Sequence, residues 1–157
     1  MKYTNTQITF SEIPDEITLC INISNCPFKC KGCHSPELWK DVGEELTTSV
    51  IDRLLQKGVT CISFMGGDSD LHRLCELLIY VKKCYPKVKT AWYTGRKEVP
   101  LYDFPLHLLD YIKLGPYIAE LGGLDKKTTN QKLYELNHRY FPYTLFKHLP
   151  LWKKDIF

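Results

Sequence analysis

Three cysteines near the N-terminus lie within eight residues, and their spacing is typical of a metal-binding loop. Cys26, Cys30 and Cys33 are separated by three and then by two residues. A loop this short can wrap three sulfurs around one metal centre, because Pro27 and Gly32 help the chain to turn. Iron–sulfur clusters take cysteine thiolates at spacings of this kind. A four-iron cluster on three cysteines would leave one iron without a protein ligand, and a substrate could bind there.

The same loop could instead hold a structural zinc ion. Zinc prefers four closed ligands, commonly two pairs of closely spaced cysteines. Cys30 and Cys33 form one such pair, and Cys26 would add a third ligand. His34 or Cys20 could complete the set, but a second close pair is missing, and Cys20 lies within a predicted strand. The spacing therefore favours the iron–sulfur cluster, and a zinc-stabilised binding module without catalysis stays as the alternative.

A second candidate motif ends the strand predicted over residues 59–65. Gly66 and Gly67 would let a ligand approach the backbone closely, and the carboxylate of Asp68 suits a cationic amine. A turn with a helix-capping aspartate would explain the same residues. The motif becomes a candidate ligand site because it stands one predicted strand after the cysteines.

A third candidate closes the strand predicted over residues 88–93. Thr94 and Gly95 could line the ribose side of the same ligand site, and a plain turn explains them equally well. In sheets of parallel strands, ligands bind at the carboxyl ends of the strands. Because the cysteines follow the strand predicted over residues 17–23, all three motifs are expected at one edge of one sheet.

The elements that would position these motifs alternate between strands and helices. Thr47 and Thr48 open a helical segment that stops at Gly58, and residues 70–84 have the spacing of an amphipathic helix. Strands are predicted over residues 17–23, 59–65, 88–93 and 111–114, with a short helix near 107–109. This alternation implies a mostly parallel sheet. Four or five strands are too few for a closed eight-stranded barrel, so we predict an α/β fold, a small, open partial (β/α) barrel.

The bulk composition narrows the class of protein. The 157 residues predict a single domain over 1–157, with an aromatic and basic tail of uncertain role from about residue 140 to 157. A net charge of +3 does not indicate nucleic-acid binding. The sequence lacks a signal peptide and an apolar run long enough to span a membrane, so a cytoplasmic protein is expected. There, seven cysteines are not expected to form a disulfide framework.

The cysteine spacing after the first strand of an incomplete barrel resembles that of the radical S-adenosylmethionine enzymes. The resemblance implies one 4Fe-4S cluster per chain, with Cys26, Cys30 and Cys33 each binding one iron. It implies that the methionine amine and carboxylate of S-adenosylmethionine bind the fourth iron. The backbone of Gly32, Cys33 and His34 would then lie beside the adenine. No catalytic side chain is implied, because the cluster and S-adenosylmethionine carry the chemistry.

The other two motifs extend the resemblance. Gly66, Gly67 and Asp68 are similar to the family's Gly-Gly-Glu motif, which holds the methionine amino group, with a carboxylate that is one methylene shorter. Thr94 and Gly95 lie where the family places contacts to the sugar. The resemblance therefore assigns all five residues to the S-adenosylmethionine site.

The length and the later segments resemble one branch of that family, the activases of the anaerobic (class III) ribonucleoside-triphosphate reductase. Residues 110–117 (DYIKLGPY) and 129–131 (TNQ) match segments of this branch. So short a chain has little material to shield a radical, which suits a protein substrate that covers the site. The implied partners are the glycyl-radical subunit of that reductase and an electron donor such as flavodoxin. An activase of a formate-lyase-type enzyme, or a small-molecule radical enzyme, is the alternative.

Overall fold

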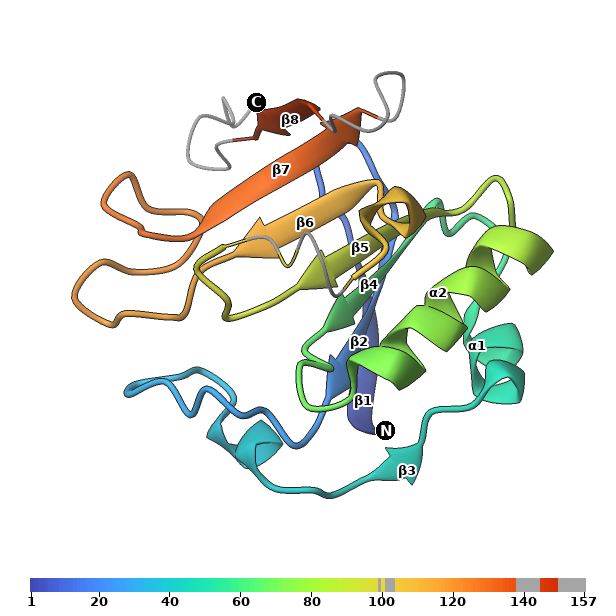
Figure 1. Ribbon diagram of the computed structural model, residues 1–157, viewed down its shortest axis with the longest axis horizontal. Coiled ribbons are helices and arrows are strands. Elements are labelled where there is room, and N and C mark those ends of the chain that lie inside the picture. Colours follow the sequence, from blue (N-terminus) through green and yellow to red (C-terminus); the bar gives the residue numbers. More distant parts are fainter. Residues whose placement is uncertain (99, 101–103, 138–144, 150–157) are drawn as a thin grey trace.

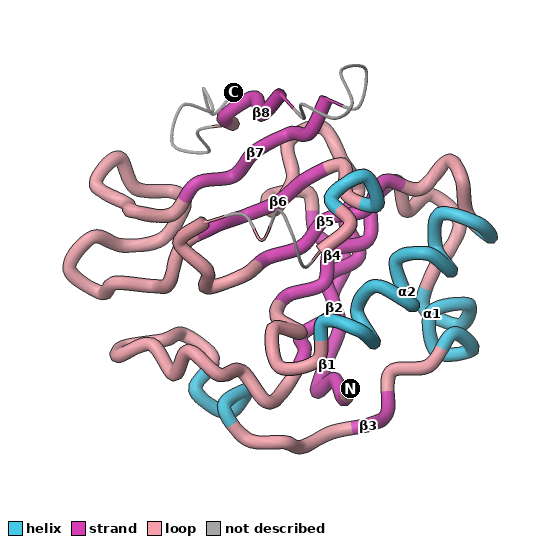
Figure 2. Tube along the Cα trace, in the orientation of Figure 1, coloured by secondary structure: helices cyan, strands magenta, loops and turns pink. Residues whose placement is uncertain are grey.

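A computed structural model of the chain describes residues 1–98, 100, 104–137 and 145–149. Within these residues, eight strands form one sheet in the order β3-β1-β2-β4-β5-β6-β7-β8. Figures 1 and 2 show a twisted sheet with both α-helices on the same side and several long loops gathered away from them. No helix in this part of the chain is both long and apolar enough to cross a membrane.

The centre of the sheet is parallel and its edges are antiparallel. The strands are β1 (Lys2–Thr9), β2 (Thr18–Ile23), β3 (Glu44–Glu45), β4 (Cys61–Met65), β5 (Lys89–Tyr93), β6 (Tyr111–Leu114), β7 (Lys132–Asn137) and β8 (Leu145–His148). The helices are η1 (Pro36–Trp39), α1 (Thr48–Leu54), α2 (Leu71–Cys84) and η2 (Leu106–Leu108). Strands β2, β4, β5 and β6 run parallel, and the other pairings are antiparallel. The α/β class is confirmed, with eight strands in place of the four or five expected.

The first predicted helix is shorter than expected. Thr47 caps α1 as predicted, but the helix ends at Leu54 and does not continue to Gly58. The chain must turn back within these few residues, because the N–H group of Thr60 donates to the carbonyl of Ile17 (2.9 Å) where β4 aligns with β2. The second helix, α2, begins and ends within one residue of the prediction.

The strands at the edges were not predicted. In β1 only Tyr3 is buried, so the strand has no apolar pattern and is held by its backbone pairing to β2 and β3. In the predicted tail, β8 pairs with β7. The remainder of that tail, residues 140–144 and 150–157, lies outside the described residues.

The two faces of the sheet carry different side chains. The outer face is large and apolar and packs against α2. Its main contributors are Leu19, Ile21, Phe64 and Trp92, with Leu74, Leu77, Leu78 and Val81 from the helix. The inner face forms a smaller cluster that includes Cys61, Tyr93 and Tyr111, covered by Ile13. Each large apolar side chain stabilises the fold by about 1.5–3 kcal/mol, so the outer face supplies most of the burial and the inner face can carry polar groups.

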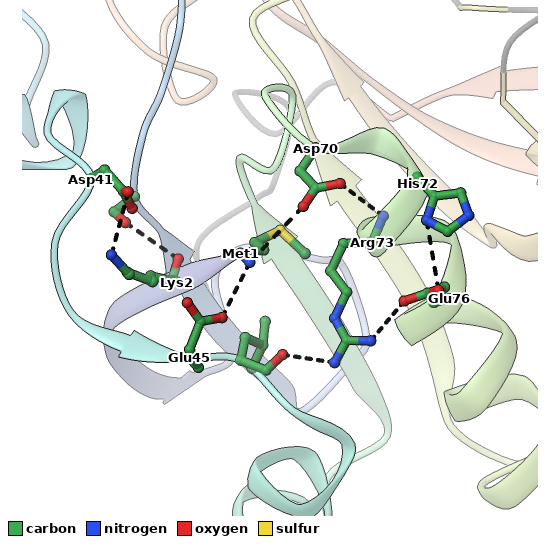
Figure 3. A network of polar contacts seen from close by, with 10 residues as sticks. Met1, Lys2, Asp41, Glu45, Asp70, His72, Arg73 and Glu76 are labelled. Atoms are coloured by element: carbon green, nitrogen blue, oxygen red, sulfur yellow. Dashed lines mark hydrogen bonds and ion pairs between the residues drawn. The ribbon is translucent and has the colours of Figure 1, made fainter.

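A network of charged groups fixes the start of α2 (Figure 3). The amine of Met1 lies 3.3 Å from Glu45 and 3.9 Å from Asp70. Asp70 accepts the backbone N–H of Arg73 (3.0 Å), and Arg73 donates to the carbonyl of Leu46 (3.2 Å). Because α2 begins directly after the glycine turn that ends β4, this network also anchors one side of that turn.

Candidate metal centre and the cavity around it

The three candidate cysteines lie on one loop, residues 25–35, which we call the cysteine loop. Each cysteine follows a residue with a left-handed backbone: φ is 61° at Asn25, 46° at Lys29 and 75° at Gly32. For the two residues that are not glycine this backbone costs about 1–2 kcal/mol each. The chain therefore turns sharply just before each of the three cysteines.

Backbone hydrogen bonds to the segment after the cysteines hold the cysteine loop in place. The N–H group of Cys26 donates to the carbonyl of Leu38 (2.8 Å), and that of Asn25 donates to the carbonyl of Lys40 (2.9 Å). Within the loop, the N–H group of Cys33 donates to the carbonyl of Cys30 (3.0 Å). These bonds place η1 beside the first cysteine.

The three thiols are free and half-buried. Burial raises the pKa of Cys26, and hydrogen bonds from the backbone of Phe28 and Lys29 oppose that rise. The N–H group of Ser35 lies 3.4 Å from the sulfur of Cys33. Hydrogen bonds of this kind to ligand sulfurs tune iron–sulfur clusters.

The donor set is made of thiols, the ligand type of iron–sulfur clusters. Among the described residues, no three histidine, cysteine, aspartate or glutamate side chains are gathered as the ligands of one metal ion would be. Cys20, a possible fourth zinc ligand, is buried within β2, and burial raises its pKa to about 12. His34, the other possible ligand, accepts or donates through Nε2 at 3.0 Å from the hydroxyl of Tyr117.

All three thiols line one cavity of about 520 Å³ at the carboxyl ends of β2, β4, β5 and β6. The predicted residues Cys26, Cys30, Cys33, His34, Gly66, Asp68, Thr94 and Gly95 are among its lining. Two predicted residues are not. A Cβ on Gly32 would meet Ala119, and a Cβ on Gly67 would meet side chains of Ile23 and Leu74. The structure thus brings the three motifs together, with Gly67 turned toward the core.

Asp68 is held rigidly at the wall of this cavity. Its side chain is only 2% exposed, and Oδ1 accepts from the hydroxyl of Thr94 (2.6 Å) and from Nε of Arg96 (3.1 Å). Burial raises the pKa of Asp68, while Thr94 and Arg96 oppose the rise. Both hydrogen bonds end on Oδ1, and Oδ2 accepts neither of them.

Gly95 and Gly66 join neighbouring parts of the site. The ring of Phe28 lies 2.5 Å from where a Cβ on Gly95 would stand, so this glycine lets the cysteine loop pack on the end of β5. The indole N–H of Trp92 donates to the carbonyl of Gly66 (2.9 Å), which ties the glycine turn to β5. At Gly66 the φ of 112° and the carbonyl oxygen of Ile23, 3.2 Å from where a Cβ would stand, are what favour glycine.

A buried charged residue of the site, Lys113, was not predicted, and neither were Glu12 and Asp125 in the lining of the cavity. Lys113 of β6 is buried, lines the cavity and donates to the carbonyls of Gly115 (2.8 Å) and Thr94 (3.4 Å). Burial lowers its pKa to about 8, and the charges of the three cysteines and Asp68 oppose the fall. Lys113 could have been identified from the sequence, because it is a lysine in an otherwise apolar strand. It lies two residues after Tyr111 and so on the same face of the sheet.

A comparison with protein families matches the chain to one model. The model describes a 4Fe-4S single cluster domain, and the match covers residues 17–134. It begins just before β2 and includes the cysteine loop, the glycine turn and the ends of β5 and β6. No curated protein and no solved structure gives a match.

Proposed function

Because the chain belongs to the family of 4Fe-4S single cluster domains, we propose that it is a radical S-adenosylmethionine activase for the anaerobic ribonucleoside-triphosphate reductase. The observation that carries the proposal is the single cavity shared by the three cysteines, Asp68 and Thr94. Three cysteines on a four-iron cluster leave one iron for a substrate, and the lining beside it offers an oriented carboxylate. The parallel strands around this cavity support an open partial barrel of the radical S-adenosylmethionine type.

The residues of the chain would bind both groups. Cys26, Cys30 and Cys33 would each hold one iron. When bound and reduced, the cluster would supply one electron that cleaves S-adenosylmethionine into methionine and a 5′-deoxyadenosyl radical. Asp68 would accept a hydrogen bond from the methionine ammonium through Oδ2. Its orientation comes from Thr94, whose hydroxyl is committed to Oδ1.

The remaining lining would position the nucleoside and balance charge. The backbone at Cys33 and His34 would lie beside the adenine, and Gly95 beside the ribose. Lys113 lines the same cavity and would offset the negative charges of the thiolates and of the methionine carboxylate. A buried charge is costly when its partner is missing. The positive charge of Lys113 would therefore be balanced fully only when the cluster and S-adenosylmethionine are bound.

The proposed reaction transfers one hydrogen atom. The 5′-deoxyadenosyl radical would take a hydrogen atom from Cα of one glycine of the reductase, giving 5′-deoxyadenosine and a glycyl radical. A one-electron donor such as flavodoxin would reduce the cluster. The segment 115–131 bounds one side of the cavity, where Gly115, Pro116 and Tyr117 line it. A loop of the protein substrate would close the opposite side and exclude water.

The test is an anaerobic incubation of the reconstituted chain with reductant, S-adenosylmethionine and the glycyl-radical subunit of the reductase. We expect a doublet in the electron paramagnetic resonance spectrum of the reductase, together with methionine and 5′-deoxyadenosine. A chain with Cys33→Ala should give none of the three signals. A radical on a formate-lyase-type enzyme only, or turnover of a free small molecule, would contradict the proposal and support the alternative activities.

A further inference from the structure

A second cavity of about 400 Å³ lies directly beside the first. We infer that it is the docking site for an extended, acidic segment of the protein substrate. This inference rests on the proposed function, because it assumes that the radical is delivered to a protein. Its support comes from the residues that line the cavity and not from the resemblance to any family.

The two cavities share one wall. Gly115 and Pro116 line both of them. The amide of Asn130 donates to the carbonyl of Pro116 (2.9 Å) and lies on the side of the second cavity, whereas its neighbour Gln131 lines the first. Gly115 approaches the backbone of residues 130 and 131 so closely that a Cβ would meet it at 3.2 Å. A polypeptide in the second cavity would therefore lie one wall away from the proposed reaction site.

Asn130 belongs to the wall of the second cavity more than to its open surface. Its amide nitrogen donates to the carbonyl of Pro116, and its Oδ1 is buried without a hydrogen-bond partner among the described residues. Because Oδ1 is closed off from solvent, the choice of a partner depends on the groups that are exposed in the cavity.

The exposed groups of the second cavity are two lysines and an apolar floor. Lys97 and Lys132 line the cavity, both are exposed, and within the described part of the chain neither side chain has an ion pair or hydrogen bond. Leu114 and Ile118 supply apolar surface, and Ile118 is 37% exposed. Two unpaired cations favour carboxylates, and the apolar floor favours a side chain between them. An acidic segment of a polypeptide carries carboxylates and apolar side chains together.

The first test measures affinity for the glycyl-radical subunit of the reductase, with the cluster-loaded chain and two double variants. Lys97→Glu with Lys132→Glu should weaken binding about tenfold at low salt, and high salt should reduce the difference, because rim charges act by screened attraction. The control, Lys57→Glu with Lys87→Glu, changes the net charge equally at exposed lysines that do not line either cavity. It should bind like the natural protein.

A second pair of variants tests the apolar floor. Ile118→Ser should weaken binding about threefold at every salt concentration, because it removes apolar contact rather than charge. Ile79→Ser is the control, since Ile79 is 52% exposed on α2 and lies in neither cavity. Equal binding by both variants would show that the apolar floor does not contribute to docking.

Separate readouts distinguish this inference from the proposed function. Each variant is also assayed for S-adenosylmethionine cleavage without the reductase, which should stay unchanged. If the natural protein activates the reductase but the Lys97 and Lys132 variant binds as tightly as its control, the inference is wrong and the function stands. Sedimentation that shows a dimer of the natural chain, lost only in that variant, would assign the cavity to a second copy and also overturn it. If the natural protein forms no glycyl radical, the proposed function itself fails.

Discussion

The direction of the three thiols is decided by the residues that precede them. Asn25, Lys29 and Gly32 all have a left-handed backbone, although only one of them is glycine. The sequence pattern predicted three thiols near one centre, but it did not show how the chain turns between them. The turns matter because a binding side chain must be held within a fraction of an ångström of its working position, and the backbone on either side of it decides that position.

Replacing Gly32 with Ala should weaken cluster binding. A Cβ there would lie 3.1 Å from that of Ala119, on a backbone with φ of 75°, at a cost of about 1–2 kcal/mol. We expect less iron and sulfide to be retained after reconstitution and gel filtration. Gly58→Ala is the control, since φ is 100° and no atom lies within 4 Å. It should lose stability in urea but keep its iron, and equal iron in both variants would refute the prediction.

Replacing Asp68 with Asn should separate stability from ligand binding. The buried carboxylate costs stability when it is ionised, and the amide can still accept from Thr94 without that cost. We expect a higher melting temperature for the cluster-free variant at neutral pH. Binding of S-adenosylmethionine to the cluster-loaded variant should weaken about tenfold, because a charged hydrogen bond to its ammonium is lost. Unchanged affinity would show that Asp68 does not contact the ligand.

The melting temperatures of these two proteins should also differ in their pH dependence. Burial raises the pKa of Asp68 in the folded protein, so the folded protein holds its proton to a higher pH than the unfolded chain. Ionisation of Asp68 therefore lowers the free energy of unfolding by its full amount above the raised pKa. This loss disappears as the pH falls through the raised pKa. The difference in melting temperature between the Asp68→Asn variant and the natural protein should therefore shrink to zero as the pH approaches 3.8, the ordinary pKa of aspartate. A calorimetric difference that is constant with pH would contradict this cause.

At the scale of elements, the central strands could be predicted and the edges could not. Strands β2, β4, β5 and β6 are short apolar runs, and the rule that parallel strands bind ligands at their carboxyl ends placed the three motifs together. Strand β1 has a mostly polar sequence and is defined by pairing with distant residues. The sequence also did not predict which of Gly66 and Gly67 lines the cavity. Both have a positive φ, and the shape of the turn decides which of them faces the cavity.

The start of α2 should contribute stability without affecting the metal centre. Asp70→Ala removes the side chain that accepts the N–H of Arg73, and we expect a loss of about 1 kcal/mol in urea denaturation. Asp70→Asn is the matched variant, because an amide oxygen can cap the helix as well, and it should lose much less. Iron content should be the same in both. A large loss of iron in Asp70→Ala would mean that the glycine turn moves with the helix end.

At the scale of the molecule, the site is completed by contacts between segments that are far apart in the chain. His34 meets Tyr117, and Phe28 packs over Gly95, so the cysteine loop is joined to the loops after β6 and β5. Composition and periodicity cannot predict such pairs, since each contact depends on the twist of the whole sheet. The loop after β6 also forms the wall between the two cavities, through Gly115 and Pro116, which is why the second cavity was not anticipated.

Anaerobic reconstitution of the chain and its cysteine variants tests whether this loop holds the cluster. The natural protein and Cys61→Ala, which alters a buried cysteine outside the cavity, should each bind about four irons and four sulfides per chain. Cys26→Ala, Cys30→Ala and Cys33→Ala should each lose most of the iron. A colourless protein with one zinc per chain, or full iron retention in any of those three variants, would contradict the assignment.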